Sequence, residues 1–106
     1  MIERNGYRGF GFFKGSPYGV AEESFLEYEK IHNNSSKRSI LRHIGQLEPA
    51  LTSAPTYDIF TGEKFQAGLF TDGDFVFTTD FAKYYREHDI GIPAEYERYL
   101  VENSLI

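Results

Sequence analysis

The chain has 106 residues, of which 17% are aromatic, and a formal net charge of −5 at pH 7. It contains no cysteine, which excludes disulfide bonds and thiolate metal sites. No apolar run approaches the roughly 20 residues of a membrane span, and residues 1–6 lack the apolar run of a signal peptide. We therefore expect a single cytoplasmic domain over residues 1–106.

The first third of the chain combines glycine with aromatic residues. Residues 7–13 are expected to form a strand, which we place at the edge of a sheet. Apolar residues at helical spacing predict a helix over residues 22–31. A second apolar face predicts a helix over residues 37–47, which Pro49 ends because proline cannot continue a helix.

Three strands are predicted next, over residues 57–60, 65–71 and 74–78. The pair Asp72-Gly73 is a signal for a two-residue hairpin turn between the last two, because both loop positions of such a turn require positive φ. The three strands are expected to form an antiparallel meander.

Two short helices follow the meander. Thr79 is predicted as the N-cap of the first helix, in which four residues from Phe81 to His88 recur on one face. Pro93 is at a favoured starting position for the second helix, whose buried face includes Tyr96 and Tyr99.

These elements predict an α+β fold, with a small antiparallel sheet of three to four strands packed against about four short helices. Within the single domain, residues 1–35 are expected to form a glycine- and aromatic-rich extension with one helix. Residues 36–106 are expected to form the core, with the meander and the two C-terminal helices.

The segment from Arg8 to Gly15 is similar to an aromatic motif of RNA-recognition domains whose rings stack on bases. That motif lies on the third strand of its fold, and the seven residues before Arg8 leave no room for the elements that must precede it. Gly9 and Gly11 also lack the full spacing of a dinucleotide-binding loop. Since the acidic balance opposes phosphate contacts, we expect no nucleic-acid partner.

The titratable residues do not form a recognisable catalytic or metal-binding pattern. Asp72, Asp74 and Asp80 lack the spacing of a calcium loop, and turn chemistry and helix capping account for them. The three histidines fall on three different helices, with no pair at metal-ligand spacing. We expect no metal, no cofactor and no catalytic residue.

Charge divides the chain into two unequal halves. Residues 1–56 carry six acidic and seven basic residues, whereas residues 57–106 carry ten acidic and four basic residues, a net of −6. An acidic half attracts basic partners, although acidic residues also keep small domains in solution. One or two tyrosines of the C-terminal helices are expected to be exposed, the alternative being that all of them pack on the sheet. The candidate partner-binding residues are Asp72, Asp74, Tyr84, Tyr85, Glu87, Asp89, Glu95 and Tyr96.

Four short motifs between residues 38 and 101 resemble a family of small, largely uncharacterised bacterial proteins. They are Tyr57-Asp58-Ile59-Phe60, the stretch from Thr71 to Phe77, the stretch from Asp80 to Tyr85, and the stretch from Ile92 to Tyr96. Phe77 stands where the family pattern has tryptophan. Proteins of this family are similar in size and acidity to immunity proteins, which are encoded beside secreted bacterial toxins. The resemblance implies no catalytic residues.

The combined expectation is a non-catalytic binding protein, most specifically an immunity-type inhibitor that occludes the basic active site of a toxin such as a nuclease. It is expected to be a monomer or weak homodimer without membrane contact. One alternative is a small enzyme or ligand-binding domain that uses residues 9–19 as the lip of a pocket. Another is a homo-oligomer that pairs through exposed strand edges or aromatic residues.

Overall fold

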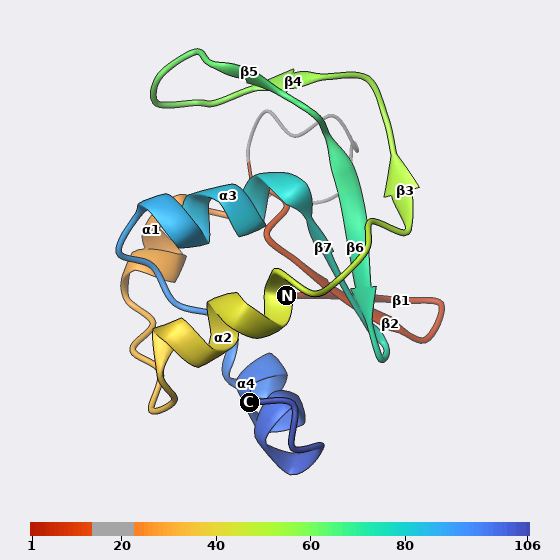
Figure 1. Cartoon of the computed structure of the whole chain (residues 1–106), viewed down its shortest axis with the longest axis vertical. Helices are drawn as coiled ribbons and strands as arrows, with labels where there is room; N and C mark the ends of the chain where they lie inside the picture. Colours follow the sequence, from red (N-terminus) through yellow and green to blue (C-terminus); the bar gives the residue numbers. More distant parts are fainter. Residues whose placement is uncertain (14–22) are drawn as a thin grey trace.

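The computed structural model describes residues 1–13 and 23–106 of the chain. The strands of the described part are β1 (Ile2–Arg4), β2 (Tyr7–Phe10), β3 (Leu51–Thr52), β4 (Thr56–Tyr57), β5 (Lys64–Phe65), β6 (Gly68–Asp72) and β7 (Phe75–Thr78). Its helices are α1 (Phe25–Glu29), α2 (Lys37–Ile44), α3 (Thr79–Glu87) and α4 (Ala94–Glu102). The α+β fold class is confirmed (Figure 1).

The main sheet has five strands in the order β1-β2-β7-β6-β3, and β4 pairs with β5 in a separate two-stranded ribbon. The prediction of a purely antiparallel sheet with three to four strands is wrong, because β2 runs parallel to β7. β2 is also an interior strand and not an edge strand. Its position follows from Phe10, which is fully buried and stacks on Phe77 with 4.9 Å between the ring centroids.

Both hairpins of the main sheet turn on two residues. Asn5 and Gly6 have φ values of 52° and 82° and join β1 to β2, and Asn-Gly is a strong sequence signal for such a turn. The second turn comprises Gly73 and Asp74 instead of the predicted Asp72-Gly73, and only Gly73 has positive φ, at 60°. Asp72 remains in the ladder opposite Phe75. This register keeps Phe75 and Phe77 facing the core, whereas a slip of one residue would turn them outwards.

Of the strand predicted over residues 57–60, only Tyr57 lies in a strand, β4, which belongs to the separate ribbon and not to the main sheet. In the main sheet, β6 pairs antiparallel with β7 on one side and with β3 on the other. Residues 58–61 form a turn, because the Asp58 carboxylate accepts hydrogen bonds from the backbone N–H groups of Phe60 and Thr61.

The helices begin close to their predicted positions. Thr78, and not Thr79, caps α3, and its hydroxyl accepts a hydrogen bond of 2.9 Å from the N–H of Phe81. α2 ends at Ile44, with Gly45 as its C-cap. Pro93 immediately precedes α4.

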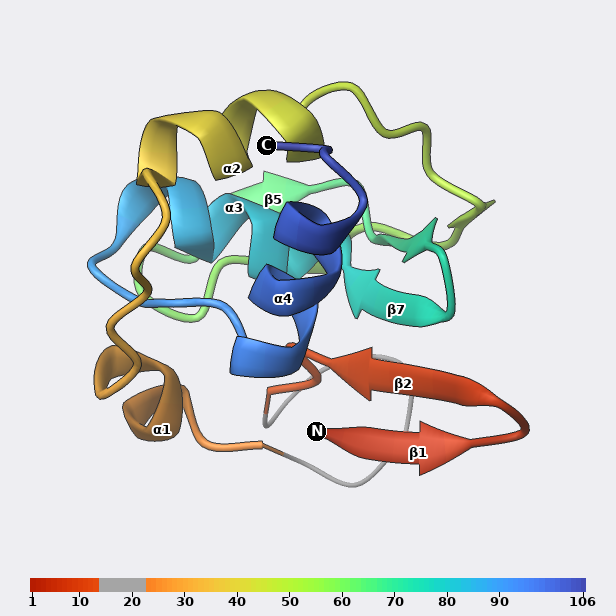
Figure 2. The same ribbon diagram turned by 90° about the horizontal axis from the view of Figure 1, so that it is seen from below.

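All four helices lie on one side of the main sheet, and α4 lies beside α2 (Figures 1 and 2). The core between the helices and the sheet is mostly aromatic. Phe10, Phe77, Phe81 and Tyr96 meet at its centre, with ring centroids 4.9–6.1 Å apart in the contacting pairs. None of the helices in the described part is long and apolar enough to cross a membrane.

Candidate functional site

The eight predicted partner-binding residues fall into two groups. The side chains of Asp72, Tyr84, Tyr85 and Tyr96 are buried, whereas Glu87, Asp89 and Glu95 are exposed and Asp74 is partly exposed. The three tyrosine rings pack the two C-terminal helices against the core, so they offer no surface to a protein partner. Tyr99 is also partly buried, and the expected exposed ring in these helices is therefore not found.

Asp72 is the acceptor of a buried polar cluster. Its Oδ2 atom lies 2.7 Å from Nε2 of His43 and accepts a hydrogen bond of 2.7 Å from the hydroxyl of Tyr96. An ionised carboxylate can only accept, so His43 donates through its Nε2–H. Burial and the Asp72 carboxylate raise the pKa of Tyr96. Because this cluster joins α2, β6 and α4, its role is to hold these elements together.

Asp74 forms a two-pronged ion pair with Arg8, whose Nε and Nη2 atoms donate hydrogen bonds of 2.9 and 2.8 Å. The guanidinium lowers the pKa of the Asp74 carboxyl. The guanidinium carbon also lies 4.0 Å from the ring centroid of Phe75. Much of the negative charge predicted for this turn is therefore balanced within the chain.

An exposed apolar surface lies on the hairpin between β4 and β5. Tyr57, Ile59 and Phe60 are 60%, 52% and 50% exposed, and we call these three residues the hairpin surface. Single exposed apolar residues are common, but three exposed within four positions are a concentration typical of interaction sites. The sequence signal for it was Tyr57-Asp58-Ile59-Phe60 itself, which lacks the alternation of a half-buried strand.

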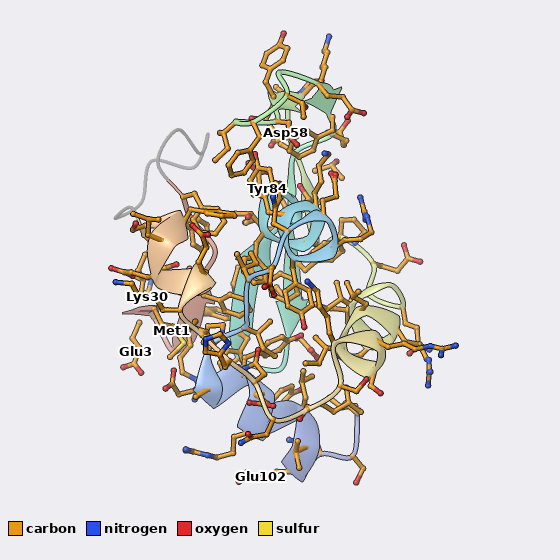
Figure 3. The ribbon with its side chains drawn as sticks, turned by 90° about the vertical axis from the view of Figure 1, so that its left-hand side faces the viewer. Met1, Glu3, Lys30, Asp58, Tyr84 and Glu102 are labelled. Atoms are coloured by element: carbon orange, nitrogen blue, oxygen red, sulfur yellow. The ribbon has the colours of Figure 1, made fainter. Side chains whose placement is uncertain are left out.

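The hairpin is fixed to α3 by polar contacts beneath the exposed side chains. The buried carboxylate of Asp58 accepts a hydrogen bond of 2.7 Å from Lys83, and the N–H of Ile59 donates to the hydroxyl of Tyr84 at 3.0 Å. Figure 3 shows Asp58 and Tyr84 close together where the hairpin meets α3. Phe60 also packs on His88, with 4.3 Å between the ring centroids. The hairpin surface is therefore held in one conformation before any partner arrives.

Acidic side chains border the hairpin surface. Lys83 contacts the carboxylates of Asp58 and Glu87 and lies 3.9 Å from Glu63, so one ammonium group serves three carboxylates. These contacts raise the pKa of Lys83 and lower that of Asp58 to about 2. The group keeps a net charge of −2, and Glu63 projects into solvent.

Candidate metal-binding groups and the expected pocket lip can be compared with the described residues only in part. Among residues 1–13 and 23–106, no group of three or more His, Asp or Glu side chains could hold a metal ion. Of the predicted pocket lip at residues 9–19, residues 14–19 lie outside the described residues. Phe10, Phe12 and Phe13 are buried, so they cannot stack on RNA bases.

Comparisons with protein-family models, with curated proteins and with solved structures found no match to this chain. The chain is an α+β domain that presents an exposed apolar hairpin with an acidic border.

Proposed function

We propose that this protein is a non-catalytic protein-binding domain, most specifically an immunity-type inhibitor that occludes the basic active site of a toxin such as a nuclease. The observation that carries the proposal is the hairpin surface, in which three large apolar side chains are held out to solvent beside a group of charge −2. The proposed binding site lies on this hairpin and does not include the buried residues Tyr84, Tyr85 and Tyr96.

The size of the patch is adequate for the centre of an interface. Completing the burial of three half-exposed side chains contributes on the order of 2–4 kcal/mol. Little conformational entropy is lost on binding, because Asp58 and Tyr84 already fix the backbone of the hairpin. The acidic border with Glu63 and Glu87 steers a basic surface towards the patch, so association is expected to slow as salt is added.

The test uses the product of the adjacent reading frame, produced with this protein and titrated against it by calorimetry. Ile59→Arg is expected to weaken binding about 100-fold, because it places a cation in the centre of the apolar contact. Val101→Arg is the matched control, since Val101 is also β-branched and 53% exposed but lies on α4. It is expected to bind like the unaltered protein.

Two results would contradict the proposal in different ways. Equal affinity of the Ile59→Arg and Val101→Arg proteins would show that the hairpin surface is not the binding site. A neighbouring product that neither binds this protein nor is inhibited by it would exclude the immunity role.

A further inference from the structure

A small cavity lies on another part of the molecule, between the α1–α2 connection and the end of α3. Its volume is about 190 Å³, and its walls include His32, Ser35, Lys37, Tyr85 and Asp89. Figure 1 shows the two connecting segments that form it, orange to yellow and blue, side by side at the left of the molecule. This volume corresponds to roughly six water molecules, which suits a ligand of a few heavy atoms.

The walls of the cavity are fixed by hydrogen bonds between the two connections. The N–H of Gly91 donates to the carbonyl of Tyr28 at 3.0 Å, and the Asn33 side chain both donates to the carbonyl of Ile92 and accepts from its N–H, each at 2.9 Å. Glu97 accepts hydrogen bonds from the backbone of Ser35 and the side chain of Asn33. The cavity therefore has walls that are held in place by hydrogen bonds between the two connecting segments.

Tyr85 supplies a polar group without a protein partner. Its side chain is only 1% exposed and lines the cavity, yet its hydroxyl forms no hydrogen bond with any residue in the described part of the chain. The hydroxyl oxygen itself is accessible from the cavity, because Asp80 Oδ1 is the only fully buried side-chain polar atom without a partner in the described part of the chain. Burial raises the pKa of Tyr85 to about 12, so the hydroxyl remains a donor at neutral pH. Inside the cavity the hydroxyl can donate a hydrogen bond to water or to an acceptor atom of a ligand.

Lys37 supplies a positive charge beside this hydroxyl. Its Nζ atom donates one hydrogen bond of 2.7 Å to the carbonyl of His88 and lies 4.7 Å from the ring centroid of Tyr85. Two of its three N–H groups remain available. Lys37 is also the first residue of α2, where the helix dipole adds positive potential. Two carboxylates reduce this positive potential. Asp89 lies on the cavity wall, and Glu97 accepts hydrogen bonds from Ser35 and Asn33.

We propose that this cavity binds a small monocarboxylate, which accepts hydrogen bonds from the ammonium group of Lys37 and the hydroxyl of Tyr85. The single charge follows from Asp89, because a second negative charge on the ligand would be repelled by this carboxylate. The site is separate from the hairpin surface and does not depend on the proposed function.

The experiment titrates the full chain with acetate at constant ionic strength and follows backbone amide signals by NMR. Saturable shifts are expected at Ser35, Lys37 and Gly91, with a dissociation constant on the order of 1–10 mM. Tyr85→Phe is expected to weaken acetate binding about fivefold, the value of one lost hydrogen bond, and to leave thermal unfolding unchanged. Lys37→Gln is expected to weaken it further, whereas Lys30→Gln, an exposed lysine on α1's C-cap, is the control without effect.

Inorganic phosphate is the second probe, and it is expected to bind more weakly than acetate. Asp89→Asn is expected to strengthen phosphate binding and so to reduce the difference between the dissociation constants of acetate and phosphate. Acetate shifts that rise without saturation, or that are equal in the Tyr85→Phe and unaltered proteins, would overturn the proposal. Tighter binding of phosphate than of acetate would overturn the assignment of a monocarboxylate.

Discussion

At the scale of single residues, the ion pair between Asp58 and Lys83 makes a pH-dependent contribution to stability. The pKa of Asp58 falls from its ordinary value to about 2 in the folded state. A carboxyl whose pKa is lowered by folding stabilises the protein above its unfolded pKa of about 3.9, and this stabilisation is lost as the pH falls through the folded pKa. The contribution is about 1–2 kcal/mol after allowance for solvent screening.

Chemical unfolding of the unaltered protein between about pH 6 and 2 is expected to show this loss, and Asp58→Asn is expected to remove most of it. Asp74 has a lowered pKa as well but its side chain is 44% exposed, so Asp74→Asn should change the acid profile much less. An identical acid profile for the Asp58→Asn and unaltered proteins would contradict the assignment.

The pKa of Asp80 is shifted in the opposite direction to that of Asp58. The Asp80 side chain is buried, its Oδ1 atom has no hydrogen-bond partner among residues 1–13 and 23–106, and burial raises its pKa. For a carboxyl with a raised folded pKa, stability falls as the pH rises from the unfolded pKa through the folded one. The favourable dipole at the start of α3 does not offset this burial.

Asp80→Asn is therefore expected to raise the free energy of unfolding at pH 7 by about 1 kcal/mol, since it removes a buried charge without changing the shape of the side chain. The gain should shrink towards pH 4, which urea titrations at several pH values would measure. The exposed Asp89→Asn is the control. A loss of stability at pH 7 would show that Asp80 is a stabilising first-turn acid.

At the scale of elements, the β6–β7 turn depends on one glycine. Gly73 has a φ of 60°, and a Cβ atom there would lie 2.7 Å from the hydroxyl oxygen of Tyr99. Gly62 has a similar φ of 75° but open space around it. Gly62→Ala thus isolates the backbone strain, about 1 kcal/mol, whereas Gly73→Ala adds a steric contact and should cost about 1 kcal/mol more in urea unfolding. Equal costs would mean that the Tyr99 ring moves aside freely.

The elements that local patterns define were predicted well. The face that recurs from Phe81 to Tyr85 places α3, and the Gly73 region places the β6–β7 hairpin to within one residue. The shift of that turn could not be read from the chain, because it depends on the contacts of Asp72 with His43 and Tyr96, which lie 29 and 24 residues away.

At the scale of the whole molecule, the non-local features were missed. The pairing of β2 with β7 has no local signal, because the glycine-rich segment reads equally well as an edge strand or as a core strand. Likewise, the −6 charge of the second half predicted an acidic surface but not its position. Tyr84 and Tyr85 proved to be core residues, and Ile59 and Phe60 became the exposed ones, since Asp58 turns the chain back before a strand can form.

The parallel pairing of β2 with β7 has a consequence for the biosynthesis of the protein. Arg8 and Asp74, which join the two strands, are 66 residues apart. At a translation rate of about 5–20 residues per second, several seconds pass between the synthesis of β2 and the synthesis of β7, the strand that pairs with it. During that time Phe10, Phe12 and Phe13 remain without their final neighbours. We expect truncated nascent chains that end before β6 to be the aggregation-prone species, and folding to be completed only after release of the C-terminal helices.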